Sequence, residues 1–443
     1  MDNIAIVIAE TEAIASEAIK LIEVDYVDLP AVYDMETAMN DDAPRLHADN
    51  PNNILSHFPI RKGDIEAGFA NADVIVEGMY ETGYQEHAYL QPEAGLSYID
   101  DEGRVTVVVA GQWVHEDLWQ ITHALNLPED RVRVIYPAIG GAFGGREDMS
   151  VQILLALATW KLQRPIKIIW SREESIKYHH KRHPMRLWAK WGATRDGKIT
   201  AIQARVIGDV GAYAYTSNKV LANTALMVTG PYVIPHVSID AYAVYTNNIP
   251  TGAFRGFGAP QAAFCAEGMM NKMADELQID PVVMRLINSI TEGSIGSVGT
   301  PFPNGVSMPQ VIEACARESF WTQEGSSWIK HPRNASPSPP LRRGVGIACS
   351  FKNVGYSFGF PEHSWAQIEI YGTSTIEKVI VRASGADVGQ GTHTAVVQMT
   401  AEAVGVPIER VQIYTHDTAG TQSSGSASAS RLVFMAGNAI RGA

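Results

Sequence analysis

The chain has 443 residues, of which 46% are hydrophobic and 19% are charged. This mixture is typical of a globular protein with two or three domains, and it excludes an intrinsically disordered chain. The formal net charge of −13 argues against nucleic acid as a main partner, because a phosphate-binding surface should be basic.

The cysteines and the hydropathy pattern restrict the cellular setting. Cys265, Cys315 and Cys349 lie far apart and form no CxxC pair. This usage predicts a reducing compartment, so we expect a cytoplasmic protein whose chain holds no iron–sulfur cluster by itself. No apolar run approaches the roughly 20 residues that a membrane-spanning helix needs, so no membrane span is expected.

The N-terminal stretch predicts a small β-α-β fragment. An apolar run at 4–9 indicates a strand, residues 11–22 a helix and residues 23–27 a second strand. This fragment is too small to close a sheet of its own, so the chain is expected to begin inside a domain. Residues 31–62 contain clusters of Asp, Pro and Asn and are expected to be loop-like.

The most distinctive stretch is a loop at 138–148 with four glycines within six positions. A strand is expected before it at 131–136 and a helix after it at 149–162, with Asp148 or Ser150 near the cap. Paired glycines permit positive φ and leave amides uncovered, and a helix N-terminus favours anions. The loop has neither the Gly-Lys-Ser/Thr of a P-loop nor the GxGxxG spacing of a dinucleotide site.

The other expected elements alternate between strands and helices, which predicts an α+β fold. The expected strands are 72–80, 95–98, 105–110, 166–170, 186–193, 199–206, 344–351, 367–371 and 379–383, and the expected helices are 115–125, 260–277, one from 280, 392–404 and one through 440. A Ser- and Pro-rich stretch at 325–343 is typical of a linker.

Several loops share glycine, a polar side chain and often an aromatic ring, next to the start of a helix. They lie at 111–112, 140–147, 253–258 and 389–391, and a serine tract at 423–430 is a fifth. Several such loops suit a large polyanionic cofactor better than a small ligand.

These loops, in this order, resemble the molybdopterin-binding subunit of the xanthine dehydrogenase and aldehyde oxidase family of molybdenum hydroxylases. Each motif alone is weak, but the ordered set is specific and covers nearly the whole chain. The motifs are Gln85-Glu86-His87, Gly111-Gln112, the loop 140–147, Arg182-His183-Pro184, the loop 253–258, Gly389-Gln390-Gly391 and Ser428-Ala429-Ser430. The resemblance implies molybdenum-cofactor-binding domains with mixed sheets and flanking helices.

The resemblance assigns most of the loop residues to the cofactor. Gln112 resembles a glutamine that hydrogen-bonds an oxo ligand of molybdenum, and Phe143 would lie beside the metal. Arg255 and Gln390 would lie against the pterin, which holds the metal without a direct protein ligand. The residues expected to bind the cofactor are Gln112, Gly141, Phe143, Gly144, Arg255, Gln390, Ser428, Ala429 and Ser430.

The resemblance also implies a set of substrate contacts. Phe257 and Phe358 match two rings between which an aromatic substrate slides, and Glu147 matches a carboxylate that hydrogen-bonds purines. Asn223 stands where purine-hydroxylating relatives carry an arginine, and Gly359 stands where they carry a threonine. These two departures argue against xanthine itself.

The implied activity is hydroxylation of an N-heteroaromatic compound or an aldehyde, with water as the oxygen source. Molybdopterin, expected as a cytosine dinucleotide, would pass electrons to iron–sulfur and FAD subunits of a hetero-oligomer. The family's general-base glutamate lies beyond residue 443, so no catalytic residue is expected here and another chain should complete the C-terminal half. Without that base the rate should fall by about 10²–10⁴-fold.

The resemblance also divides the chain into segments. Residues 1–38 match the tail of an N-terminal hammerhead-like domain, and residues 39–324 match the first molybdopterin-binding domain. A linker is expected at 325–343, and residues 344–443 match the N-terminal part of the second molybdopterin-binding domain. A gene split over two polypeptides and a fragmentary sequence both explain this pattern.

Several candidates also have structural explanations. His179 and His183 form an i, i+4 pair that could ligate a metal with His180, but Pro184 and the lack of an HExxH motif favour a strand edge. His87 is expected to be a structural histidine.

Three loop residues carry similar alternatives. Glu147 could serve only to favour a helix N-terminus, Arg255 could pair with a buried carboxylate, and Phe254 could belong to the core.

Three rival functions remain on the sequence. A non-catalytic scaffold subunit of the same complex would also carry these motifs without the base. A carbon monoxide oxidiser is disfavoured, because no cysteine near 140–147 could hold a second metal. A nucleotide-binding module is disfavoured by the failed fingerprints.

Overall fold

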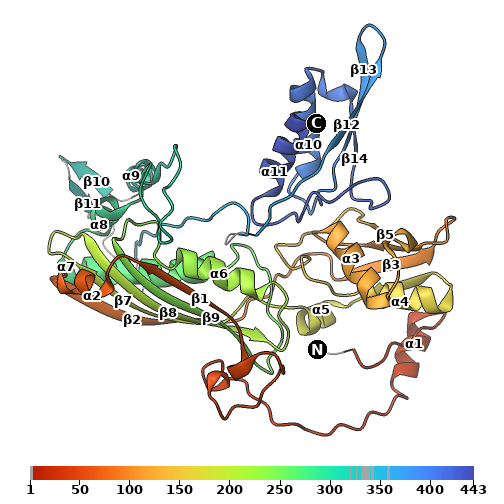
Figure 1. Ribbon diagram of the computed structural model, residues 1–443, viewed down its shortest axis with the longest axis horizontal. Coiled ribbons are helices and arrows are strands. Elements are labelled where there is room, and N and C mark those ends of the chain that lie inside the picture. The colour runs from red at the N-terminus through yellow and green to blue at the C-terminus, as the bar shows by residue number, and fades with distance from the viewer. Residues whose placement is uncertain (1–2, 320, 326, 331–339, 341–343, 357–359) are drawn as a thin grey trace.

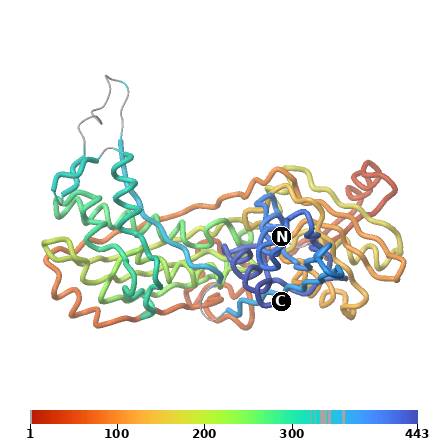
Figure 2. Tube along the Cα trace, turned by 90° about the horizontal axis from the view of Figure 1, so that it is seen from above, coloured from red at the N-terminus to blue at the C-terminus, as the bar shows by residue number. Residues whose placement is uncertain are grey.

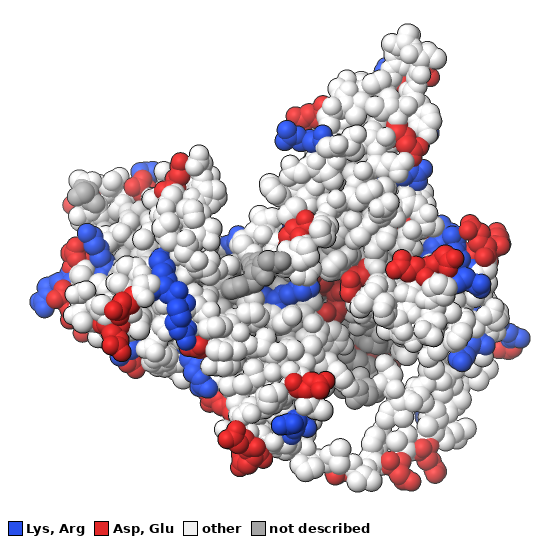
Figure 3. Space-filling view, in the orientation of Figure 1, with Lys and Arg blue, Asp and Glu red and all other residues white. Residues whose placement is uncertain are grey.

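The computed structural model describes residues 3–319, 321–325, 327–330, 340, 344–356 and 360–443. Within these residues the chain forms four sheets with helices packed beside them, which confirms an α+β fold with mixed sheets (Figure 1). No helix in the described part of the chain is long and apolar enough to cross a membrane. Figure 3 shows Lys and Arg scattered among Asp and Glu, without a broad basic patch on that face.

The largest unit is a five-stranded sheet in the order β1-β9-β8-β7-β2 (Figure 1). Neighbouring strands are antiparallel except β8 and β9, which are parallel. Buried and half-exposed residues alternate along much of β7 and β9, because successive side chains point to opposite faces. The helices α6 and α7 pack on this sheet and enclose a core that contains the fully buried Trp191. The elements are β1 (Ile54–Lys62), α2 (Ile65–Ala70), β2 (Val74–Thr82), β7 (Met185–Ala193), β8 (Ile199–Gly211), α6 (Ser217–Met227), β9 (His236–Tyr245) and α7 (Ala259–Leu277).

A second unit is built on a four-stranded sheet in the order β5-β4-β3-β6. Its β4 is almost fully buried and consists of valines apart from Thr106, and α4 packs against β3 and β4. The β4–β5 pair is parallel, so both strands end at the edge where the glycine-rich loop begins. The elements are β3 (Ala94–Ile99), β4 (Val105–Val109), α3 (Val114–Leu125), β5 (Val132–Ile135), α4 (Gln152–Leu162), β6 (Ile166–Ile169) and α5 (Arg172–Tyr178).

The C-terminal residues form a third unit with its own small core. Its sheet has the order β12-β13-β14, and α10 and α11 pack together beside it. Figures 1 and 2 show this blue unit over the four-stranded one. The elements are β12 (Gln367–Gly372), β13 (Ile376–Arg382), α10 (Thr392–Val404), β14 (Val411–Tyr414) and α11 (Leu432–Gly442). A smaller group precedes it, consisting of α8 (Pro281–Asn288), α9 (Met308–Glu318), β10 (Trp321–Glu324) and β11 (Ser327–Lys330).

The N-terminal residues differ from the expectation. Only the predicted helix forms, as α1 (Glu12–Ile19), while residues 3–9 and 23–29 form no strand and are largely exposed. A strand requires a partner for its backbone hydrogen bonds, and the described residues place none beside these segments. The loop expected at 31–62 is also partly wrong, because its last nine residues form the edge strand β1.

Two further predictions failed and several elements were missed. Residues 344–351 form no strand, although Ile347 and Cys349 pack on the small group around α9. β11 lies inside the expected linker at 325–343, most of which falls outside the described residues. The helices and strands without a sequence prediction are α2, α5, α6, α9, β9, β10 and β14.

Candidate functional site

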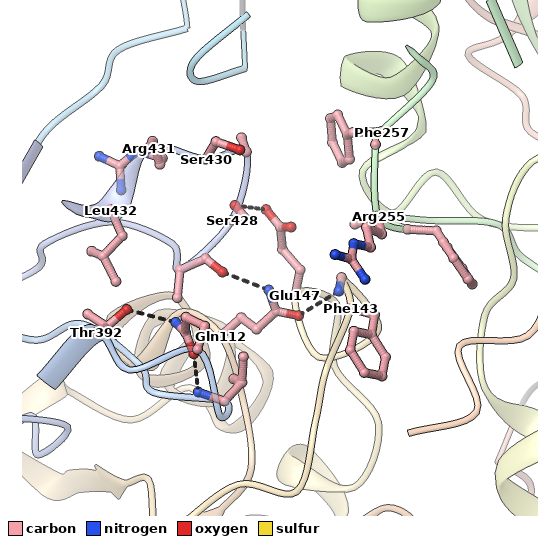
Figure 4. A pocket seen from close by; sticks show the side chains of 18 of the residues that line it. Gln112, Phe143, Glu147, Arg255, Phe257, Thr392, Ser428, Ser430, Arg431 and Leu432 are labelled. Atoms are coloured by element: carbon pink, nitrogen blue, oxygen red, sulfur yellow. Dashed lines mark hydrogen bonds between the residues drawn. The ribbon is translucent and has the colours of Figure 1, made fainter. Parts of the chain in front are cut away.

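A cavity of about 630 Å³ opens where loops of the three units meet (Figure 4). This volume lies in the range of sites for small organic ligands and cofactors. The five loops singled out in the sequence converge here, although they are spread between residues 111 and 430. The lining residues are Gln112, Phe143, Gly144, Glu147, Ala253, Phe254, Arg255, Gly256, Phe257, Lys352, Val388, Gly389, Gln390, Thr392, Ala427, Ser428, Ala429, Ser430, Arg431, Leu432 and Val433.

Gln112 joins two of these loops across the cavity wall. Its Oε1 accepts the backbone N–H groups of Gly144 at 3.1 Å and Arg146 at 3.2 Å, and its Nε2 donates to the carbonyl of Ala427 at 2.9 Å (Figure 4). Its backbone carbonyl also accepts the N–H of Ala427 at 2.8 Å. The described residues offer no acceptor for the second Nε2 hydrogen. Gln112 is only 3% exposed, so this amide is a fixed donor at the cavity wall.

The glycine-rich loop turns sharply beside the cavity. Phe143 has φ 54° and Gly144 has φ 98°, both in the left-handed region. A Cβ on Gly144 would lie 2.9 Å from the backbone of Ala253, so this glycine is needed for a close approach between two loops. Gly141 also has a positive φ but does not line the cavity. A Cβ built on Gly141 would lie 3.0 Å from the Cβ of Tyr89.

Replacing Gly144 with alanine should lower the free energy of unfolding by about 2–3 kcal/mol, because the methyl group adds backbone strain and a clash with Ala253. Urea unfolding measures this loss. Gly103→Ala is the matched control, since Gly103 also has a positive φ (75°) but has open space around it. Equal losses in the two variants would show that the close approach contributes nothing.

The second glycine–aromatic loop contributes a cation and a ring. The backbone N–H of Arg255 donates to the carbonyl of Phe143 at 2.8 Å, while its guanidinium pairs with no carboxylate in the described part of the chain. The alternative of a buried ion pair for Arg255 is therefore not supported. Phe257 is 6% exposed and belongs to the main core as well as to the cavity wall, with its ring centroid 5.7 Å from that of Tyr356. Phe254 packs on His87.

Gln390 is held within its own turn. Its Oε1 accepts the N–H of Val388 at 2.6 Å, and its Nε2 donates to the Ala386 carbonyl and to Thr392 Oγ1. Gly389 and Gly391, which flank Gln390, both have a positive φ, and a Cβ built on either would meet no atom of the described residues within 4 Å.

The serine tract closes one side of the cavity. Ala429 and Ser430 both have a positive φ, which turns the backbone sharply after Ser428. Arg431, which follows directly, is 2% exposed and forms an ion pair with Glu362 while it donates to two carbonyls of the same tract. The tract is therefore anchored by a buried arginine.

Glu147 is a buried acid at the cavity. Its Oε1 accepts a hydrogen bond from the hydroxyl of Ser428 at 3.1 Å (Figure 4) and another from the hydroxyl of Tyr356. Its buried Oε2 has no partner among the described residues. Burial, with a smaller contribution from the neighbouring Asp148, raises the pKa of Glu147 to about 8. This carboxyl is therefore mainly neutral at pH 7 and can donate a hydrogen bond.

The raised pKa of Glu147 predicts a pH-dependent stability difference. The folded state holds this proton more tightly than the unfolded state, so the stabilisation is complete below about pH 4.5 and is lost as the pH rises through 8. Relative to Glu147→Gln, the wild-type free energy of unfolding should fall over this window, by at most about 1.4 kcal/mol per pH unit. Urea unfolding at pH 5 and pH 8.5 measures it, with Glu173→Gln as an exposed control. A constant difference would contradict the buried neutral carboxyl.

One predicted substrate residue, Asn223, is not among the described residues that line the cavity. Asn223 is fully buried behind it and donates from Nδ2 to the carbonyl of Tyr356 at 3.5 Å. Phe358 and Gly359 lie outside the described residues. The lining residues that the sequence did not single out include Lys352, Thr392, Arg431, Leu432 and Val433. Thr392 and Arg431 had a usable signal, since each directly follows a stretch that the sequence had singled out.

The histidines do not form the i, i+4 pair considered from the sequence. His183 instead hydrogen-bonds Ser217 Oγ through Nε2 at 2.7 Å. His179 and His180 join His87, and one nitrogen of each ring lies within 4.8 Å of the others. These three buried rings lie directly behind the glycine-rich loop.

Comparisons with known proteins agree with this arrangement. Two family models, each described as a molybdopterin cofactor-binding domain, match residues 46–289 and 315–443. The nicotinate dehydrogenase large molybdopterin subunit of Eubacterium barkeri is 41% identical over 317 residues, which are 72% of this chain and 74% of that one. A probable xanthine dehydrogenase subunit of Bacillus subtilis is 33% identical over 99% of this chain.

The fold has a similar counterpart among solved structures. An aldehyde oxidoreductase from Desulfovibrio desulfuricans superimposes with a TM-score of 0.86 at 26% identity, over 98% of this chain. The chain spans 57% of the Bacillus relative and 47% of the Desulfovibrio protein. The chain therefore belongs to the molybdopterin cofactor-binding large subunits of the xanthine dehydrogenase-like molybdenum hydroxylases.

Proposed function

We propose that this chain forms one part of a molybdenum hydroxylase that oxidises an N-heteroaromatic compound or an aldehyde, with water as the oxygen source. The observation that carries the proposal is the convergence of five separated loops on one cavity, with Gln112, Arg255 and Glu147 at its wall. The similarity to a nicotinate dehydrogenase subunit and to an aldehyde oxidoreductase supports this substrate range.

The residues of the cavity fit a phosphorylated pterin. Arg255 offers a guanidinium without a carboxylate partner among the described residues, which favours a phosphate or another anion. Backbone turns with positive φ at Phe143, Ala429 and Ser430 expose amides in the same way as known anion-binding turns. We accordingly propose a cofactor-binding set that consists of residues 112, 141, 143, 144, 255, 390 and 428–430. Gly141 would contribute through the conformation of its loop, because it does not line the cavity.

When bound, the molybdenum cofactor supplies a Lewis-acid metal and accepts the electrons of the reaction. Gln112 holds its free Nε2 hydrogen toward the cavity, because its other polar groups are fixed by three backbone groups. Phe257 offers a flat apolar wall for a planar ring, worth about 0.5–1.5 kcal/mol beyond burial when two rings pair. Glu147 in its neutral form can hold its proton on the buried Oε2, so it presents an uncharged polar group at the cavity wall.

We further propose that other chains complete the enzyme. Another polypeptide would supply the general-base glutamate and the rest of the second molybdopterin-binding domain, whose first part is residues 344–443. Iron–sulfur and FAD subunits would accept the electrons, and the pterin would be a cytosine dinucleotide. The three cysteines of the chain are free, which supports a reducing compartment such as the cytoplasm.

The test is substrate reduction of the assembled complex, purified from its native host without oxygen. Addition of nicotinate, a purine or an aromatic aldehyde should bleach the iron–sulfur absorbance with at least one compound. The product should carry ¹⁸O when the reaction is run in H₂¹⁸O. Incorporation from O₂ instead of water would contradict the proposal, and a molybdenum-loaded complex that none of the three compounds reduces would favour a different substrate class or a scaffold subunit.

A further inference from the structure

The three-histidine cluster lies outside the cavity but touches its wall. His87, His179 and His180 are 5%, 3% and 4% exposed, and their ring centroids lie 4.2–5.2 Å apart. A Cβ on Gly145 would meet both His179 and His87 at 2.9 Å, so the glycine-rich loop rests directly on these rings. Neither the cofactor contacts nor the substrate contacts proposed above use this cluster.

Each ring binds a backbone carbonyl through Nε2. His87 and His180 both bind the carbonyl of Ala253, at 2.7 and 3.2 Å, and His179 binds the carbonyl of Gly145 at 2.5 Å. A carbonyl oxygen can only accept, so each Nε2 carries a hydrogen and donates it. The Nδ1 atoms of His87 and His179 are left buried without a partner among the described residues.

The surroundings keep the rings neutral. Burial and the neighbouring His180 lower the pKa of His87 to about 2, and burial lowers the pKa of His180 to about 4. Burial, with His180 and His87, lowers the pKa of His179 well below its usual range. Lys181 and Arg182 add to this effect, while Glu86 and Glu93 act in the opposite direction on His180. Glu93 lies 3.8 Å from His179 Nε2, and Asp148 lies 3.8 Å from His180 Nε2. A neutral ring can keep donating to a carbonyl over the whole physiological range of pH.

The two carbonyls belong to the loops that form the cavity. Ala253 lines the cavity, and Gly145 follows Gly144, whose backbone N–H is bound by Gln112. The same two loops are joined by the hydrogen bond from the Arg255 N–H to the Phe143 carbonyl. A histidine that fixes these carbonyls therefore fixes the positions of the amide and the guanidinium that face the cofactor.

We propose that His87, His179 and His180 form a neutral hydrogen-bonding clamp, here called the His clamp, which positions both cavity loops for the molybdenum cofactor. These are positioning residues, because they touch neither cofactor nor substrate. The inference rests on the proposed function, and it predicts that the clamp affects retention of the cofactor and the geometry at the metal more than it affects folding.

The test uses the assembled complex with His87→Leu and His179→Leu, each compared with the conservative variants His87→Gln and His179→Gln. A glutamine can place its Nε2 donor where the histidine has its own, whereas leucine leaves a buried carbonyl unpaired. His47→Leu is the matched control, because His47 also binds a backbone carbonyl through Nε2, that of Ala212 at 2.8 Å, away from the cavity lining. The measurements are molybdenum and pterin per complex during dilution, the Mo(V) electron paramagnetic resonance spectrum, and the thermal midpoint.

The leucine variants should lose the cofactor about tenfold faster than the wild type and shift the Mo(V) spectrum, and the glutamine variants should restore both. His47→Leu should keep both at the wild-type value. Leucine variants that keep the cofactor and the wild-type Mo(V) spectrum would overturn the clamp. Glutamine variants that lose the cofactor as fast as the leucine variants, with an unchanged thermal midpoint, would also overturn it. Both results would leave the proposed function intact.

Two other results would also overturn the clamp. The first is one zinc ion per chain in the wild type that is absent from the His87 and His179 variants, which would identify the cluster as a metal site. A folded wild-type complex without molybdenum would contradict the proposed function itself, and the clamp with it.

Discussion

Replacing Gln112 with methionine is expected to destabilise the chain by about 3 kcal/mol or more and to remove most of the bound molybdenum. The side chain keeps its length but loses the acceptor for two backbone N–H groups and the donor to one carbonyl, all of them in cavity loops. Each buried group left without a partner costs about 1–3 kcal/mol. Urea unfolding and metal analysis of the assembled complex measure the two effects.

Gln120→Met is the control for Gln112. Gln120 lies on the following helix in a half-buried position, and its amide binds Glu116 at 3.1 Å, away from the cavity loops. This variant should stay within about 0.5 kcal/mol of the wild type and keep its molybdenum. A Gln112→Met variant that behaves in the same way would show that the amide does not hold the two loops together.

The second large effect is expected from Arg285→Met, which should cost about 3–5 kcal/mol because it leaves a buried carboxylate without its cation. Arg285 is fully buried and donates from Nε and Nη2 to Glu267 Oε2 at 2.8 and 2.7 Å. The same carboxylate accepts from the hydroxyl of Tyr232 and from the backbone N–H of Cys349. This ion pair therefore joins α7 and α8 to the segment that leads to the C-terminal unit.

Arg317→Met on the neighbouring α9 is the matched control, since Arg317 pairs with Glu313 on the surface and is about half exposed. Exposed pairs contribute about 0–1 kcal/mol, so this variant should unfold almost as the wild type does. Urea unfolding of both variants is the measurement. Similar losses for Arg285→Met and Arg317→Met would contradict the structural role of the buried pair.

The loops of the site could be predicted from the sequence because their chemistry is local. A glycine-rich turn between a strand and a helix, as at 138–148, needs positive φ whatever surrounds it, and the structure shows this at Phe143 and Gly144. The order of the motifs then indicated the family. The central strands were found for the same reason, since buried runs such as 105–110 carry their own apolar pattern.

Other features depend on contacts between distant residues and could not be predicted. The neutral state of Glu147 depends on burial beneath Tyr356 and Ser428, more than 200 positions away in sequence. The His clamp depends on His87 meeting His179 and His180, which no spacing in the sequence reveals. The prediction of strands at 4–9 and 23–27 was wrong, because an apolar run forms a strand only when another strand lies beside it.

One measurement decides whether the cavity is a molybdenum cofactor site. The chain is purified from its native host together with whatever binds it, and molybdenum and oxidised pterin are quantified per chain. The proposed function predicts close to one molybdenum and one pterin, accompanied by iron and flavin from the partner subunits. A folded complex that contains its partners but neither molybdenum nor pterin would contradict it.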